Sequence, residues 1–176
     1  MDALFLQLYC MRISDVLLLG LFGTLLLYLL KQLWGNSPVW KPLMAMLLLA
    51  WAAAVAAQTV MGRDSDGGDL ILMPLHSYRE AIWGGRRELL RSNFMNAFLF
   101  YPPGLIGWEL LPARMRPKYK MLILLLAALT MSLTIESLQY LGNLGLAETD
   151  DVIHNTLGTA LAAILCRIRS GGNKSP

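Results

Sequence analysis

The sequence predicts an all-α fold, a polytopic membrane bundle of about five transmembrane helices. Hydrophobic residues make up 56% of the 176-residue chain and charged residues only 15%, whereas soluble domains carry about 25% charged residues. Charges divide the chain into five long apolar stretches that lack the alternating pattern of half-buried strands. Because lipid accepts only helices or closed barrels as spanning structures, we interpret these stretches as helices. The same composition excludes an intrinsically disordered chain, which requires low hydrophobicity.

Each apolar stretch is long enough to cross a bilayer. A spanning helix needs about 20 mostly apolar residues, and about 17 suffice. The second and fourth stretches meet this length directly, and the others meet it when charged side chains at their ends snorkel to the interface. The predicted helices cover residues 13–34, 43–61, 93–111, 119–141 and 150–168. The first stretch lacks the basic lead-in and cleavage site of a signal peptide, so we expect it to remain as a membrane anchor.

The third predicted helix contains two adjacent prolines, Pro102 and Pro103. Each proline removes a backbone donor and clashes with the preceding turn, which kinks or breaks a helix. The sequence therefore predicts a kink in this helix, with a break near residues 101–104.

The distribution of Lys and Arg predicts the orientation of the bundle. The loop at 112–120 has four basic residues and no acidic residue, which places it in the cytoplasm by the positive-inside rule. Five other basic residues fit the same side: Lys31, Lys41, Arg167, Arg169 and Lys174. We expect a multi-pass protein of the cell membrane with its N-terminus outside and its C-terminus in the cytoplasm.

The long loop at residues 62–92 is then external. It opens with a polar, glycine-rich turn, and the short apolar stretch at 69–76 is expected to dip into the headgroup region. Residues 79–91 mix Arg with Trp and Leu, which favours an interfacial helix on the outer leaflet. Its arginines would either snorkel to lipid headgroups or bind a phosphate or carboxylate.

Two polar residues interrupt the fourth helix near its outer end. Glu136 and Gln139 are three residues apart and share one helix face. A carboxylate within the bilayer costs several kcal/mol, about 2.5 to 3.5 on translocon scales at a helix centre. The residue is therefore either functional or held by a structural hydrogen bond between helices.

The fifth helix begins with a polar segment. Thr149 is a good N-cap, and Asp150 and Asp151 suit the positive end of the helix dipole. Asp151, Asn155, Gly158 and Ala162 form one stripe whose small residues allow a close helix approach. Asn155 lies at the depth of Glu136 and of two asparagines on the third helix, Asn93 and Asn96. We therefore expect Glu136, Asn155 and Asn96 to converge, with Gln139 on the same face and Asp151 at the outer mouth.

These residues resemble the VanZ family of bacterial membrane proteins. The pieces that carry the resemblance, in order, are Met73-Pro74-Leu75-His76, Asn93-x-x-Asn96 with Phe100, Pro102 and Gly104, Ile135-Glu136-x-x-Gln139, and Asp150-Asp151 with Asn155, Thr156 and Gly158. The resemblance implies three regions. Residues 1–71 hold two N-terminal helices and the start of the outer loop, 72–168 form a VanZ-like core, and 169–176 form a cytoplasmic tail.

The founding member of this family is linked to teicoplanin resistance, so the resemblance implies a role in the bacterial cell envelope. The first hypothesis is a protein that binds a lipopeptide or lipid-linked ligand, such as a lipoglycopeptide or a cell-wall precursor, at the outer leaflet. Its candidate ligand-binding residues are Asn93, Asn96, Glu136, Gln139, Asp151, His154 and Asn155.

Two further hypotheses stay open. One is an intramembrane enzyme acting on a lipid or cell-wall precursor, with Glu136 as general base and His154 with Asp150 assisting. The other is a structural helper of a larger complex. The sequence shows no metal-binding motif and no nucleic-acid motif, so no cofactor, metal or nucleic acid is expected. Membrane lipid is an expected partner because the predicted helices are apolar. Neither the oligomeric state nor the ligand follows from the sequence.

Overall fold

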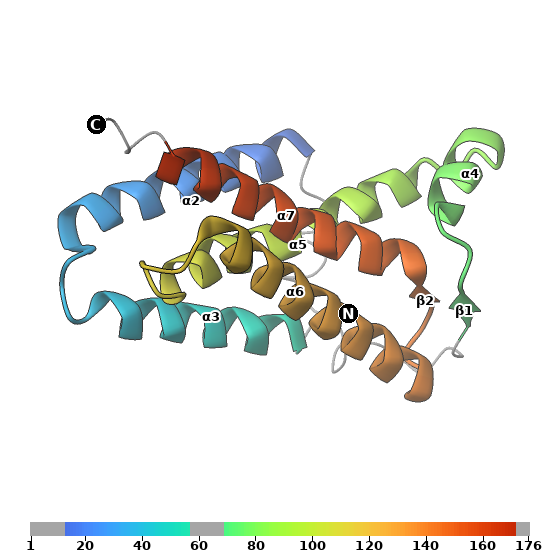
Figure 1. The fold of residues 1–176 in the computed structure, drawn as a ribbon. Coiled ribbons are helices and arrows are strands. Elements are labelled where there is room, and N and C mark those ends of the chain that lie inside the picture. The colour runs from blue at the N-terminus through green and yellow to red at the C-terminus, as the bar shows by residue number, and fades with distance from the viewer. Residues whose placement is uncertain (1–12, 57–68, 172–176) are drawn as a thin grey trace.

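The computed structural model describes residues 13–56 and 69–171, and Figure 1 shows their arrangement. The end of the second predicted helix, the polar turn of the outer loop and the C-terminal tail from residue 172 lie outside these residues. The described part contains six helices: α2 (Ile13–Trp34), α3 (Trp40–Ala56), α4 (His76–Trp83), α5 (Glu88–Leu110), α6 (Pro117–Leu141) and α7 (Thr149–Gly171). The predicted helical class is confirmed, and the first and fourth predicted helices match α2 and α6 closely.

The bundle has two distinct ends, which Figure 1 separates clearly. The connections α2–α3 and α5–α6 and the C-terminal end of α7 lie together at one end. We call it the basic end, after the residues Lys31, Lys41, Arg114, Arg116, Lys118, Lys120, Arg167 and Arg169. Helix α4 and the two short strands lie at the opposite end, here called the strand end. These are the same connections that the positive-inside rule assigned to the cytoplasmic side in the sequence analysis.

Helices α5 and α7 form the centre of the bundle, and small residues bring them together. A Cβ atom on Gly158 would stand 1.9 Å from the carbonyl oxygen of Ala97, so no larger residue fits there without a shift of backbone. A Cβ atom on Gly104 would stand 2.7 Å from the Cβ atom of Ala162. The predicted small-residue stripe of α7 is therefore a helix-packing face, as expected for helices that associate in lipid.

The predicted break in the third helix is wrong. Helix α5 runs without interruption from Glu88 to Leu110, with Pro102 and Pro103 inside it. The hydroxyl of Thr159 on α7 donates a hydrogen bond to the carbonyl oxygen of Phe100, at 3.0 Å. Spanning helices tolerate proline when neighbouring helices and Ser or Thr side chains satisfy the disturbed backbone. The carbonyls that lose their helical donors are those of Phe98 and Leu99, so Thr159 holds the carbonyl next to them, and close packing against α7 supports the helix through this turn.

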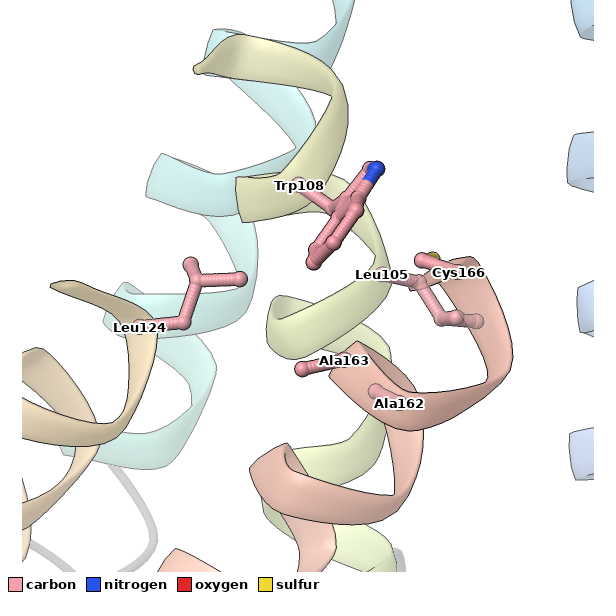
Figure 2. Packing of buried hydrophobic residues seen from close by; sticks show 6 residues of the cluster. All are labelled: Leu105, Trp108, Leu124, Ala162, Ala163 and Cys166. Carbon is pink, nitrogen blue, oxygen red and sulfur yellow. The ribbon is translucent and has the colours of Figure 1, made fainter. Parts of the chain in front are cut away.

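Apolar clusters join the helices along this centre. Figure 2 shows one cluster in which Leu105 and Trp108 of α5 face Leu124 of α6 and three residues of α7, Ala162, Ala163 and Cys166. A second cluster joins Trp40 and Met44 of α3 to Ile106 of α5. Small side chains on α7 thus leave room for the large ones of α5.

Many large apolar side chains face outward, which is unusual for a soluble monomer. Leu21 on α2 is 68% exposed, Leu49 on α3 is 71% exposed and Leu133 on α6 is 50% exposed. Among the described residues, Pro117–Leu141 is the helix that is long and apolar enough to cross a membrane, and Leu18–Trp34 and Trp40–Ala56 are shorter apolar helices. The count of five spans stays a prediction.

The outer loop differs from the expected one. Strand β1 (Leu70–Ile71) pairs in parallel with β2 (Ala147–Glu148), although no strand was predicted. The interfacial helix expected at residues 79–91 is instead α4, which ends at Trp83 and is followed by Gly84 as its C-cap. Gly85 then adopts φ +71°, a left-handed conformation that favours glycine, and the remaining residues from Glu88 belong to α5.

Candidate functional site

A buried carboxylate, Asp150, organises the strand end. It is 1% exposed. Its Oδ1 accepts a hydrogen bond from the backbone N–H of Leu75, and its Oδ2 accepts the backbone N–H of Ser77 at 2.8 Å and the Ser77 hydroxyl. Asn93 on α5 donates from Nδ2 to the Ser77 hydroxyl oxygen at 2.7 Å. Side chains from α4, α5 and α7 therefore form one buried network.

The position of Asp150 follows from two helix starts. It lies in the first turn of α7, as the sequence predicted from the helix dipole. It also accepts the N–H groups that begin α4, where Leu75 has a left-handed φ of 62° and the helix has no side-chain cap of its own. The N-terminal N–H groups of a helix need acceptors, and an anion suits that end. One carboxylate thus stabilises the N-terminal ends of two helices, α4 and α7.

His154 continues the network along α7. Its Nδ1 lies 2.6 Å from the backbone carbonyl oxygen of Asp150, and its Nε2 lies 2.8 Å from the hydroxyl of Tyr78. A carbonyl oxygen only accepts, so Nδ1 carries a proton and donates it, while Nε2 and the Tyr78 hydroxyl share the second hydrogen bond. The two rings also stack, with centroids 5.6 Å apart. His154 therefore contacts the Asp150 backbone rather than its carboxylate, which differs from the assisting pair considered above.

Glu136 and Gln139 both face the interior, as predicted. They are 8% and 2% exposed. Glu136 Oε2 accepts the backbone N–H of Glu148 at 2.9 Å, and the carbonyl of Gln139 accepts the N–H of Leu144 at 2.8 Å. Both contacts fix the connection between α6 and α7. A direct hydrogen bond from Glu136 to Asn96 or Asn155 stays a prediction.

Asn155 joins α7 to α6 about one helical turn further from the strand end than Glu136 does. Its Nδ2 donates to the Ser132 hydroxyl at 2.8 Å, and both residues are buried. Its Oδ1 is buried without a hydrogen-bond partner among the described residues, and the same holds for Nδ2 of Asn96 on α5. Asn96 precedes Ala97, whose carbonyl oxygen lies against Gly158, and Asn155 lies three residues before Gly158, so both asparagines lie within about one turn of this contact, a region that we call the asparagine level. Buried polar atoms are normally hydrogen-bonded, so an unused donor and an unused acceptor mark this level as a candidate site.

Glu148 adds a titratable group beside Asp150. Burial raises the pKa of Glu148 above its ordinary value, and the negative charge of Asp150 raises it further. Asp151, predicted at the outer mouth, lies half-buried in the first turn of α7 next to these carboxylates. The strand end therefore concentrates acidic groups.

Sequence reasoning missed three of these residues and the main role of a fourth. Asp150 was assigned to the dipole of its own helix and to an assisting role beside His154, and Ser77, Tyr78 and Ser132 were not considered. Ser132 lies four residues before Glu136, on the same helix face, so helix periodicity could have found it. Nothing local in the sequence indicates that Ser77 or Tyr78 meets α7. Across residues 13–56 and 69–171 no group of three or more His, Cys, Asp or Glu side chains is placed to hold a metal ion.

The family model described as VanZ/LLP1 matches residues 39–170, about three quarters of the chain. The match begins before the expected core boundary at residue 72 and therefore includes α3. No curated protein and no solved structure matches the chain.

Proposed function

The chain belongs to the VanZ/LLP1 family of membrane proteins, and from this premise we propose that it acts in the bacterial cell envelope. It binds the polar part of a lipopeptide or lipid-linked ligand at the outer leaflet and contributes to teicoplanin resistance. In this proposal the strand end faces outward, the basic end faces the cytoplasm, and five helices cross the membrane.

The observation that carries this proposal is the unused polar pair on α5 and α7. Asn155 is 4% exposed, and its Oδ1 lacks a partner within the described chain, as does Nδ2 of Asn96. One atom accepts and the other donates, which is the complement of a peptide amide or a hydroxyl group. Peptide antibiotics and cell-wall precursors carry both kinds of group.

The network around Asp150 supports the same proposal. Asp150, Ser77 and Asn93 attach α4 to the bundle directly above the asparagine level. Helix α4 exposes Ile82 and Trp83, which are 67% and 78% exposed. Such side chains suit the interfacial region, where a lipid-anchored ligand would approach the site.

Antibiotic sensitivity tests the proposal. The chain is expressed in a susceptible bacterium, and teicoplanin and vancomycin sensitivity are measured for wild type, Asn96→Leu and the vector control. Asn96→Leu removes a donor that has no partner in the described structure, so no hydrogen bond of the fold is lost and the protein should accumulate normally. We expect wild type to lower teicoplanin sensitivity and Asn96→Leu to abolish that effect.

The control variant is Thr134→Val, which removes an exposed hydroxyl that bonds only to the Thr130 carbonyl of its own helix. It should behave as wild type. Wild type and vector control with equal sensitivity would contradict the resistance proposal for this chain. Glu136→Gln, tested alongside, addresses the enzyme hypothesis. A general base must ionise, so this variant should lose the effect if Glu136 is a general base. A side chain that only braces the helices needs to accept a hydrogen bond, so the variant should then behave as wild type.

A further inference from the structure

A small cavity lies at the basic end, between α2, α3, α5 and α7. It encloses about 10 Å³, which is enough for one water molecule. Its polar lining includes Trp40 on α3, Glu109 on α5 and Arg169 on α7, and its apolar lining includes Met44 and Ile106. The cavity stands at the opposite end of the bundle from the asparagine level and is independent of the ligand proposed there.

Trp40 supplies this cavity with a hydrogen-bond donor. The residue is 4% exposed, and its indole Nε1 is buried without a partner among the described residues. An indole N–H only donates, and a buried tryptophan usually reaches an acceptor. Water is an acceptor small enough for a cavity of this size, so it can satisfy the indole where a larger ligand has no room.

Glu109 supplies the cavity with an acceptor. Its Oε1 accepts from Lys31 Nζ and from Arg169 Nη2, both at 2.8 Å, and its Oε2 lies 2.7 Å from Lys31 Nζ. A carboxylate offers about four lone-pair positions, so Oε2 can accept a further hydrogen bond. A water molecule in the cavity would thus have a donor on one side and an acceptor on the other, as buried waters require.

The same carboxylate attaches α2 to the rest of the bundle. Helix α2 lies outside the matched residues 39–170, and none of its described side chains is buried. Its polar contacts with α5 are the ion pair of Lys31 with Glu109 and a hydrogen bond between the Thr24 and Tyr101 hydroxyls, 2.9 Å apart. Polar contacts contribute to helix association in lipid, where apolar surface alone gives little driving force. The position of the Glu109 carboxylate therefore matters for holding α2.

We propose that one internal water molecule binds in this cavity and joins Trp40 to the ion cluster of Lys31, Glu109 and Arg169. The water accepts the indole N–H of Trp40 and donates to Oε2 of Glu109. It fixes the carboxylate that holds both cations, so α3 takes part in attaching α2 to α5 and α7. Trp40 is then a positioning residue that acts on the ion cluster through the water.

NMR of the full chain in nanodiscs, with ¹⁵N-labelled tryptophan, tests for the water directly. The indole resonance that disappears in Trp40→Phe identifies Trp40. In wild type we expect a cross-peak between this N–H and water, with the sign of cross-relaxation to a long-lived bound water rather than of hydrogen exchange. Trp34 is the matched control, because it is 55% exposed at the same end and should show exchange with bulk water only. A Trp40 indole without such a cross-peak would overturn the proposal.

A double-mutant cycle tests the coupling between the two residues. Trp40→Phe keeps the ring and removes the N–H, and Glu109→Gln replaces one carboxylate oxygen by a donor. If the water joins them, the melting temperature of the double variant should fall by less than the sum of the two single falls. Trp34→Phe combined with Glu109→Gln is the control cycle and should be additive. Additivity in both cycles would contradict the bridge. Coupling without a water cross-peak would indicate a direct contact, and the water assignment would be wrong.

Discussion

Glu136 on α6 holds the start of α7, since its Oε2 accepts the backbone N–H of Glu148 across 2.9 Å. This contact explains why a carboxylate stands in an otherwise apolar helix. Glu148 is the last residue of β2 and immediately precedes α7, so a side chain of the preceding helix fixes the residue from which α7 starts. The strand end is thus built from carboxylates that receive backbone N–H groups, Glu136 at α7 and Asp150 at α4.

Glu136→Ala should destabilise the protein by about 1–3 kcal/mol, the usual cost of leaving a buried donor without its acceptor. Glu136→Gln should cost less, because its amide oxygen still accepts the N–H of Glu148. Thermal unfolding in detergent measures both variants. The contact would have no structural value if Ala and Gln variants unfold at the wild-type temperature.

Gly158→Ala should be strongly destabilising because its new Cβ atom would stand 1.9 Å from the Ala97 carbonyl oxygen. Overpacking of this kind costs typically about 1–3 kcal/mol, and backbone contact allows little relaxation. Gly23→Ala on α2 is the matched control, since a Cβ atom there meets nothing within 4 Å. The control should be neutral or stabilising by up to about 1 kcal/mol, because alanine favours a helix. Similar melting temperatures for the two variants would exclude the described α5–α7 packing.

Asp150→Asn should release α4 from the bundle. The substitution removes the charge from hydrogen bonds that are worth about 1.5–3 kcal/mol when one partner is ionised. Hydrogen exchange should therefore accelerate at the amides of Leu75 and Ser77, while amides in the centre of α5 stay protected. Ser77→Ala tests the coupling, because the double variant should cost less than the sum of the two single changes. Strict additivity would contradict a shared network.

Glu148 should make stability depend on pH. Its folded pKa lies above its ordinary value of 4.5, so the native state binds more protons than the unfolded state in the interval between the two. Stability then falls as pH rises through that interval, and the full loss remains at neutral pH. Glu148→Gln should abolish this component and raise the melting temperature at pH 7 relative to wild type. The exposed Glu88 supplies the control, Glu88→Gln, which should leave the pH profile unchanged.

Cysteine labelling checks the proposed orientation. In a Cys10→Ser background, Ile82→Cys on α4 should react with an impermeant maleimide in intact cells, and Ala113→Cys should react only after permeabilisation. Both positions are exposed, and buried Cys166 should stay unlabelled. Labelling of both positions from outside would contradict the charge-based topology.

Local features of the sequence determined one part of this structure, and contacts between distant segments determined another. Hydrophobic length and charge spacing are local, and they determined the helical class, the limits of α2 and α6, and the grouping of basic residues at one end. The cost of burying Glu136 and the shared face of Gln139 are also local, so the sequence alone predicted that both face inward.

Only the tertiary structure decided how these helices meet. Asp150 serves α4 through contacts with Leu75 and Ser77, which are more than 70 residues away, and no local pattern encodes such a pair. Proline chemistry alone predicted a broken α5, but the helix is continuous where it packs closely against α7. Strands of two residues are too short to leave a periodic signal. Contacts between distant segments decided each of these points, because such contacts exist only once the bundle has formed.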